Sequence, residues 1–359
     1  MKKKILSMIL AFALLITCFS MTAFAGEADN TVYNLSMTIH VSQTTAHCKA
    51  LDEWAARVAE KSNGRLNIVI NYGGTLASGP DAVEFVQQGG CDIAWSTVSL
   101  NAAMFKYCNI LSMYGEELSN AELATYVYMN MSRNNEAFAN EFSSVGLTLL
   151  GAHGMTPSLI AGNGDKIETV EDFKGESIMS ISKTCISVLE GLGAAVQGVT
   201  TADLYDNFAK NVVQASLVDA SLYSAMQIYE QFAWMNTYNY NSALAFIVMN
   251  ADKFNSLPED LQQILMEEFE TVSMACAQYT DEDFTNFVEN VIPENNVEVY
   301  GTSDEVIAAV NEQLAAAIET PWEEACAAAG YDTEAIRSEV EALIEEGRAT
   351  YGESYDWFK

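Results

Sequence analysis

Positively charged side chains are scarce in this sequence. Of its 359 residues only 17 are lysine or arginine, against 49 aspartate or glutamate, and the formal net charge at pH 7 is −32. A surface this acidic repels nucleic acid and anionic lipid, which excludes both as partners. Cationic and neutral small solutes remain open. The acidic residues are spread along the chain, which is typical of a solvated and soluble surface.

Signatures of common enzymes are also absent. The sequence has no Gly-x-Ser-x-Gly, no His-Glu-x-x-His and no phosphate-binding loop. Its only histidines are His40, His47 and His153. We expect His40 and His153 to contact a ligand, because both follow predicted strands at a presumed cleft. His47 falls in the first turn of a predicted helix and is expected to be solvated. An exported hydrolase or metal site that uses His40 or His153 remains an alternative, and we assign no catalytic residue, metal ligand or cofactor.

Cysteine pairs with the spacing of a metal site are missing too. The seven cysteines include no Cys-x-x-Cys, and their spacing does not fit a zinc site. Several lie within apolar patterns, where a small buried thiol is the ordinary state. We therefore expect mostly free thiols, although an exported chain could bridge some of them.

A long apolar run occurs only at the N-terminus. Lys2–Lys4 form a basic start, Ile5–Ile16 an apolar stretch too short for a permanent membrane anchor, and Ala23–Ala25 a small-x-small cleavage site. Residues 1–25 are therefore predicted to be a secretion signal. The mature protein is expected in the periplasm or at the extracellular cell surface. Lipid attachment at Cys18 is the alternative to cleavage after Ala25.

Low-complexity linkers and internal repeats are absent, although the chain exceeds the usual size of one domain. Strand patterns at 36–41, 66–70 and 91–95 alternate with helical patterns, which predicts an open, mostly parallel α/β sheet. We expect two α/β lobes that the chain enters more than once. The predicted boundaries are 31–153 plus 244–283 for lobe I, 154–243 plus 284–345 for lobe II, and 346–359 for a C-terminal tail.

The stretch 169–220 has the alternating strand and helix pattern of βαβ units. Thr169 and Asp172 form a predicted capping box. A strand at 177–181 and a helix that ends at Gly191–Gly193 follow, and then a second strand and helix. The stretch therefore predicts a further parallel sheet with crossover helices.

The C-terminal third is predicted to be helical. The capping-box sequence 256–259 begins a helix that continues to about Val291. At about 1.5 Å per residue such a helix is long enough to contact both lobes. Thr302 and Glu305 form a second predicted cap, which begins another helix.

Four segments carry a pattern that is shared with a known family. Ser62–Leu66, Val170–Gly175, Gly191–Ala194 and Ala202–Tyr205 resemble the "sgGrl", "ped-lkG", "lGa" and "sEvYtAL" segments of the DctP family, the solute-binding proteins of TRAP transporters. The resemblance implies the type II periplasmic-binding-protein fold, an α/β fold in which two lobes close on a small organic solute. It also implies a helix that spans both lobes, TRAP membrane subunits as partners, and a monomeric receptor.

The arginine that pairs with a carboxylate ligand in this family falls, by the spacing of the resemblance, on Met179. A thioether cannot replace the bidentate guanidinium. The sequence also has no arginine between Arg133 and Arg337. We therefore do not expect a simple carboxylate as ligand, but a neutral, zwitterionic or cationic solute that is rich in hydroxyls or carries a ring. Lys183 remains open as a substitute cation.

The candidate ligand site combines histidines, aromatic rings and small polar side chains near the predicted strand ends and cleft edges. Aromatic faces pack on sugar rings and attract ammonium groups, and Asp219 would attract a cation or accept from hydroxyls. The candidate residues are His40, Trp95, Ser96, Thr97, His153, Met155, Met179, Thr201, Asp219, Tyr223, Tyr238 and Asn239. A receptor that signals to a membrane protein instead of feeding a transporter is a further alternative.

Overall fold

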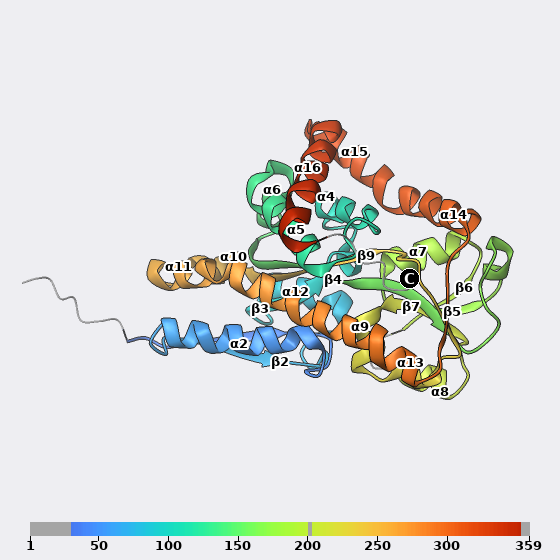
Figure 1. Ribbon diagram of the computed structural model, residues 1–359. Coiled ribbons are helices and arrows are strands. Elements are labelled where there is room, and N and C mark those ends of the chain that lie inside the picture. The colour runs from blue at the N-terminus through green and yellow to red at the C-terminus, as the bar shows by residue number, and fades with distance from the viewer. Residues whose placement is uncertain (1–29, 200–202, 353–359) are drawn as a thin grey trace, which may run out of the picture. The chain divides into compact units, whose positions relative to one another are not determined.

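The computed structural model describes residues 30–199 and 203–352 (Figure 1). The chain divides into two compact units, residues 1–33 and residues 34–359. Apart from Tyr33 at the start of β1, every described helix and strand lies in the second unit. The predicted secretion signal, the alternative lipid site at Cys18 and the end of the C-terminal tail lie outside the described residues.

One connected sheet contains all ten strands of the described residues. The strand order is β2-β1-β3-β9-β4-β7-β5-β6, and β8 pairs with both β4 and β10. The strands are β1 Tyr33–Thr38, β2 Leu66–Asn71, β3 Ile93–Thr97, β4 Leu147–Gly162, β5 Ser177–Ser180, β6 Ala195–Gly198, β7 Ala215–Asp219, β8 Trp234–Asn236, β9 Ser242–Asn250 and β10 Glu298–Tyr300.

Helices connect the strands and form most of the C-terminal third. The α-helices are α2 Ala46–Lys61, α3 Ala82–Gln87, α4 Lys106–Asn109, α5 Ala121–Asn134, α6 Glu136–Ser144, α7 Lys183–Gly191, α8 Leu204–Ala209, α9 Ala220–Ala225, α10 Ala251–Asn255, α11 Glu259–Glu267, α12 Phe269–Asn286, α13 Ile292–Glu294, α14 Asp304–Leu314, α15 Thr320–Ala329 and α16 Thr333–Tyr351. In the part of the chain that is described, no helix is both long enough and apolar enough to span a bilayer.

The sheet is mixed, which corrects the prediction of a mostly parallel one. β1 is parallel to β3, and β5 is parallel to both β6 and β7. β9, however, is antiparallel to β3 and to β4, and β4 is antiparallel to β7. The prediction of parallel pairing holds for β1 with β3 and for β5 with β6 and β7. It is wrong for the pairs that β4 and β9 form with these two groups and with each other. Local periodicity indicates that a strand exists, but it carries no information about which distant strand becomes its neighbour.

β4 joins the two groups of strands. Its first part pairs with β9 and its second part with β7, and the pairing with β9 is irregular between Gly154 and Pro157. At Gly154 the strand lies so close to α5 that an added Cβ would come within 2.5 Å of the Cβ of Ala124. Only glycine permits that approach. β4 and β9 contain the two crossings at which the predicted lobes meet, and the lobe boundaries stay a prediction.

The long helix predicted to begin at 256–259 is present as a nearly continuous series. α11, α12, the π-helical turn Phe287–Val291 and α13 follow one another, with only Glu268 between α11 and α12. Pro258 is the N-cap residue of α11, and no described side chain makes a capping hydrogen bond to this helix. The predicted capping box is therefore wrong. α12 packs against α2, α5 and β4, and also against α9 (Figure 1). It therefore contacts elements from both predicted lobes.

The other two predicted caps have opposite outcomes. The capping box of Thr169 and Asp172 is present and begins a short 3-10 helix. The cap predicted at Thr302 is wrong by one residue, because Ser303 caps α14 and Thr302 instead donates to Asn236. The helices that follow, α15 and α16, pack on α4 and α5, which belong to predicted lobe I.

The core is filled by large aromatic side chains. Phe105 lies 4.8 Å from both Phe142 and Phe246, measured between ring centroids. All three rings are buried, and burial of one such side chain contributes about 1.5–3 kcal/mol. The six described cysteines are likewise buried, and all of them are free.

Candidate functional site

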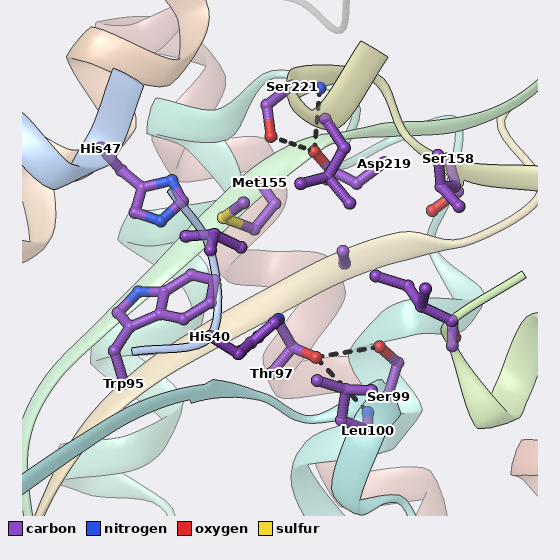
Figure 2. Close-up of a pocket in the computed structure, with 16 residues that line it drawn as sticks. His40, His47, Trp95, Thr97, Ser99, Leu100, Met155, Ser158, Asp219 and Ser221 are labelled. Atoms are coloured by element: carbon purple, nitrogen blue, oxygen red, sulfur yellow. Dashed lines mark hydrogen bonds between the residues drawn. The ribbon is translucent and has the colours of Figure 1, made fainter. Parts of the chain in front are cut away.

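A small cavity lies where the ends of β1, β3, β5 and β7 meet the middle of β4 (Figure 2). We call it the inner cavity. Its volume is about 40 Å³, which holds about three groups the size of a water molecule. Apolar and small polar side chains line it: His40, Val41, His47, Trp95, Thr97, Ser99, Leu100, Met155, Ser158, Ile181, Ser182, Val218, Asp219, Ser221, Leu222 and Ala243.

A second, larger space adjoins the inner cavity. We call it the outer pocket, and its volume is about 640 Å³. The two spaces are adjacent, because they share four lining residues: His40, Leu100, Ile181 and Leu222. The rest of the outer pocket is lined by uncharged residues, namely Ser42, Gln43, Thr45, Tyr72, Gly73, Gly74, Ser78, Gly79, Pro80, Val199 and Met226.

All three histidines of the sequence gather around Trp95. The imidazole of His47 stacks on the indole with ring centroids 4.5 Å apart and planes 13° apart. His40 and His153 approach the same indole at centroid distances of 5.5 Å and 6.0 Å. Burial lowers the pKa of His40 and of His153 to about 4, and it lowers the pKa of His47 well below its usual value. The three imidazoles are therefore neutral at pH 7.

His47 is fully buried, so the prediction that it is solvated is wrong. α2 begins beside the cavity, and the first turn of the helix therefore points inward at Trp95 instead of outward to water. Neither ring nitrogen of His47 has a hydrogen-bond partner among the described residues. A neutral imidazole offers one donor and one acceptor, and His47 keeps both available at the cavity wall.

His40 follows β1 and lines both spaces. Its Nδ1 atom is buried and lacks a partner within the described part of the chain. Gly79 fixes the ring from behind, because a Cβ at Gly79 would lie 3.0 Å from Cγ of His40. The imidazole is thus held against Trp95 while one polar atom remains free for a solute.

Among the described residues, Asp219 is the only charged side chain that lines the inner cavity. Its Oδ1 atom accepts from Thr156 Oγ1 at 2.6 Å, from the backbone N–H of Ser221 at 3.0 Å and from the Ser221 hydroxyl. Its Oδ2 atom is buried, with no partner that the structure describes. Burial raises the pKa of this carboxyl to about 6, against the lowering effect of those hydrogen bonds.

No lysine or arginine from the described residues lines either space. The five arginines of the sequence all pair with carboxylates elsewhere: Arg57 with Glu268, Arg65 with Asp260, Arg133 with Glu270, Arg337 with Glu319 and Arg348 with Glu345. Lys183, the substitute cation left open by the sequence, is exposed at the start of α7 and is not among the lining residues.

Five of the twelve predicted site residues lie together in the inner cavity. They come from three strands and the loop that follows β1, and they are His40, Trp95, Thr97, Met155 and Asp219. In Figure 2 the rings of His47 and Trp95 lie on one side, Asp219 and Ser221 lie on another, and Met155 stands between the two groups. Strand ends were therefore a sound guide to the place of the cavity.

Six other predicted residues are placed outside the cavity lining and have partners within the protein. Ser96 accepts from Asn101, and His153 accepts from Trp95. Met179 is buried in β5, two residues before Ile181. The remaining three bind backbone or core groups: Tyr223 donates to the carbonyl of Leu159, Tyr238 to Asn311 and Asn239 to the carbonyl of Gly115. Thr201 lies outside the described residues.

The sequence did not single out several lining residues. Ser158 and Ser182 contribute hydroxyls, and Ile181, Val218 and Leu222 contribute apolar surface. Ser182 was recognisable in principle, because it is the N-cap of α7 directly after a strand and accepts from the N–H of Cys185. The apolar residues have no such signal, since they look like ordinary core in the sequence. Within the described residues no group of three or more potential metal ligands is present.

Comparison with known proteins agrees with this architecture. Residues 37–325 match the family described as bacterial extracellular solute-binding protein, family 7, or DctP. The chain belongs to this family. The predicted DctP resemblance and the two-lobe α/β periplasmic-binding fold are thereby confirmed, and the expected role as a binding receptor rather than an enzyme agrees with the family.

Individual relatives are distant in sequence. A "solute-binding protein" of Chromohalobacter salexigens is 22% identical over 183 residues, which is 51% of this chain and 54% of that relative's length. A TRAP periplasmic solute-binding protein from Desulfovibrio salexigens has a TM-score of 0.72 and 21% identity, covering 91% of this DctP chain and 99% of the other. One from Bordetella bronchiseptica with bound (R)- and (S)-mandelate has a TM-score of 0.76 and 17% identity, covering 88% and 99%. Such structural likeness shows the fold.

Proposed function

We propose that this DctP protein is an extracytoplasmic receptor that captures one small organic solute and delivers it, as a monomer, to a TRAP-type secondary transporter. The family match supports the receptor class and an extracellular location. The inner cavity and the outer pocket together supply the binding cleft. The membrane partner is supported by the family alone, whereas export is supported by the family and by the signal-like pattern of residues 1–25.

The solute that we propose is neutral, zwitterionic or cationic, and not a simple carboxylate. The observation that carries this proposal is the charge of the cavity: Asp219 is its only charged side chain within residues 30–199 and 203–352, and the arginines of the chain are paired elsewhere. An unpaired carboxylate in a buried site beside another carboxylate has no counter-charge, and such a site is strongly unfavourable. The mandelate found in the Bordetella protein is a ligand of that protein.

Closure of two lobes would complete the site. We propose that the hinge lies where the chain crosses between the predicted lobes, near 152–155 in β4 and 243–249 in β9. Asp219 and Ser158 lie between these two crossings in the sequence, whereas His40 and Trp95 lie before the first. Closure would exclude water from the mostly apolar inner cavity and so strengthen each polar contact with the solute.

A thermal-shift screen tests this proposal. The mature protein is screened against sugars, nucleosides and amines in one set, and against mandelate, benzoate, pyroglutamate and glucuronate in another. Mass-action stabilisation predicts a shift of several degrees for at least one member of the first set, at about 100-fold excess over its Kd. The acids are expected to give no shift. A large shift with the acids alone would contradict the proposed ligand class.

A further inference from the structure

The two oxygens of the Asp219 carboxylate have different roles. Oδ1 is fully occupied, because it accepts from Thr156 and twice from Ser221, and it thereby caps the short helix α9. The structural requirement for an acceptor at the start of α9 is met by this one oxygen. Oδ2 has no partner within the described residues, and it is buried. A buried carboxylate oxygen without a partner is costly, unless a donor arrives from a bound molecule.

The surroundings of Asp219 favour a positively charged donor. The titratable groups that act on it from neighbouring elements are Cys185 on α7, Tyr223 on α9 and Asp283 on α12. None of them is a cation, and Asp283 adds a second negative charge whose own Oδ2 also lacks a partner in the described structure. An ammonium group would supply both the missing hydrogen bond and the missing charge.

An anion is disfavoured at the opposite wall. Burial lowers the pKa of His40 and of His153 to about 4, and these two rings depress the pKa of His47 further through mutual repulsion. At pH 7 the histidines therefore present neutral donors and acceptors. Without a protonated imidazole, lysine or arginine at the lining, a carboxylate or phosphate would meet only Asp219 as a charged neighbour. These walls suit hydroxyl, ether or amide groups.

The sizes of the two spaces set the orientation of the solute. The inner cavity, at about 40 Å³, accepts an ammonium with a short hydrocarbon stem but not a whole ring. The outer pocket, at about 640 Å³, is large enough for a ring or a chain of several atoms, and the described part of its lining has no charged side chain. The body of the solute is therefore uncharged, which excludes a free amino acid because its α-carboxylate would lie unpaired.

We propose that the inner cavity is an ammonium subsite, in which Asp219 Oδ2 accepts from the positively charged head of a solute whose uncharged body lies in the outer pocket. The proposal rests on the proposed receptor function and narrows its ligand class to monoammonium compounds. The neutral nitrogens of His40 and His47 bind polar atoms close to the head.

Matched probes that differ only in the head group test the subsite by isothermal titration at pH 7.5. The three sets are tyramine with tyrosol and 4-hydroxyphenylacetate, 6-amino-6-deoxyglucose with glucose and glucuronate, and 5-aminopentanol with 1,5-pentanediol and 5-hydroxypentanoate. In at least one set the ammonium member is expected to bind at least tenfold more tightly than both isosteres. If no ammonium member does so, the ammonium subsite is wrong. If only carboxylate members bind, the proposed ligand class of the receptor is wrong as well.

Asp219→Asn identifies the group responsible. Asparagine keeps an oxygen that can cap α9, so the fold is expected to survive, and circular dichroism melting checks this. The variant is expected to lose at least about 30-fold in affinity for the ammonium probe, since loss of one partner of a buried charge pair has a large effect. Asp206→Asn is the matched control: it removes an exposed carboxylate on α8 that pairs with Lys210 and does not line the cavity, and affinity is expected to stay within about threefold.

The pH profile separates a charge contact from a structural role. Protonation of Asp219 removes its attraction for an ammonium, and the pKa of this carboxyl in the empty site is about 6. Affinity of the wild type for the ammonium probe is therefore expected to fall as pH drops from 7 to 5, whereas the affinity that remains in Asp219→Asn stays flat. A neutral probe that binds wild type and variant equally well would overturn the subsite and leave the receptor function standing.

Discussion

The indole Nε1–H of Trp95 donates to Nε2 of His153 at 2.9 Å. This bond fixes the tautomer of His153, because an accepting Nε2 carries no proton and Nδ1 must then donate to the carbonyl of Gly154, 2.8 Å away. Both nitrogens of His153 are thereby used inside the protein. The ligand contact predicted for His153 from its strand position stays a prediction, and the structure shows that its ring binds Trp95, which lines the cavity.

Substitution of His153 is expected to affect stability more than recognition. His153→Phe leaves the buried indole N–H without an acceptor, which costs about 1–3 kcal/mol. His153→Gln keeps an acceptor and is expected to lose less. Urea unfolding measures both. Unchanged stability of His153→Phe together with lost solute binding would show that His153 contacts the solute after all.

Substitution of His47 is expected to affect solute recognition more than stability. His47→Phe keeps the stacking on Trp95 and removes two buried nitrogens that have no partner in the described chain. The free energy of unfolding is expected to stay equal or to rise by up to about 1–2 kcal/mol, while solute affinity falls at least about tenfold. Chemical denaturation and titration calorimetry on one preparation test the two effects. A variant that is less stable but binds normally would contradict this account of His47.

Glu141 predicts a pH-dependent contribution to stability. Its carboxylate is buried and accepts from the backbone N–H groups of Tyr107 and Cys108 at the start of α4. Burial raises its pKa from 4.5 to about 7. Between these values the folded chain binds a proton that the unfolded chain does not, so this contribution is present below pH 4.5 and is lost as pH rises through 7.

The comparison with Glu141→Gln isolates this group. The difference in free energy of unfolding between wild type and variant is expected to grow in favour of the wild type as pH falls from 8 to 5, by up to about 3 kcal/mol. Urea titrations at several pH values provide the measurement. A difference that stays constant over this range would mean that Glu141 does not titrate there.

The missing arginine can be restored. Met179 lies in β5, and Ile181, which lines the cavity, follows directly after the end of this strand at Ser180. Met179→Arg alone is expected to pair with Asp219, so the double variant Met179→Arg with Asp219→Asn is the informative one. Its affinity for mandelate is expected to exceed that of Asp219→Asn with Met179→Leu at least tenfold. Equal affinity in two folded variants would refute the placement of residue 179 at the site.

The sequence was a better guide to backbone positions than to side-chain surroundings. Periodicity located β2 and β5 and, with bounds shifted by two or three residues, β1 and β3, whereas β8 and β10 were not predicted. Strand ends pointed to His40, Trp95 and Asp219. The aromatic residues Tyr223 and Tyr238 were less predictable, because their hydroxyls are satisfied by distant groups such as the carbonyl of Leu159 and the side chain of Asn311. Such partners depend on tertiary packing, which a linear pattern does not contain.

The burial of His47 was likewise not predictable from the sequence pattern. A histidine in the first turn of an amphipathic helix looks solvated in the sequence. Its burial follows from the start of α2 beside the cavity and from the stacking on Trp95, 48 residues away in the sequence. The mixed sheet has a similar cause, since the position of β9 between β3 and β4 depends on pairings far apart in the chain.

The central claim is that this cavity, without a lining cation, holds a solute that is not a simple carboxylate. The most direct measurement is native mass spectrometry of the exported protein, followed by release and identification of whatever solute co-purifies. We predict a compound with an ammonium head and an uncharged body. A mono- or dicarboxylate without an ammonium group as the sole bound species would contradict the claim.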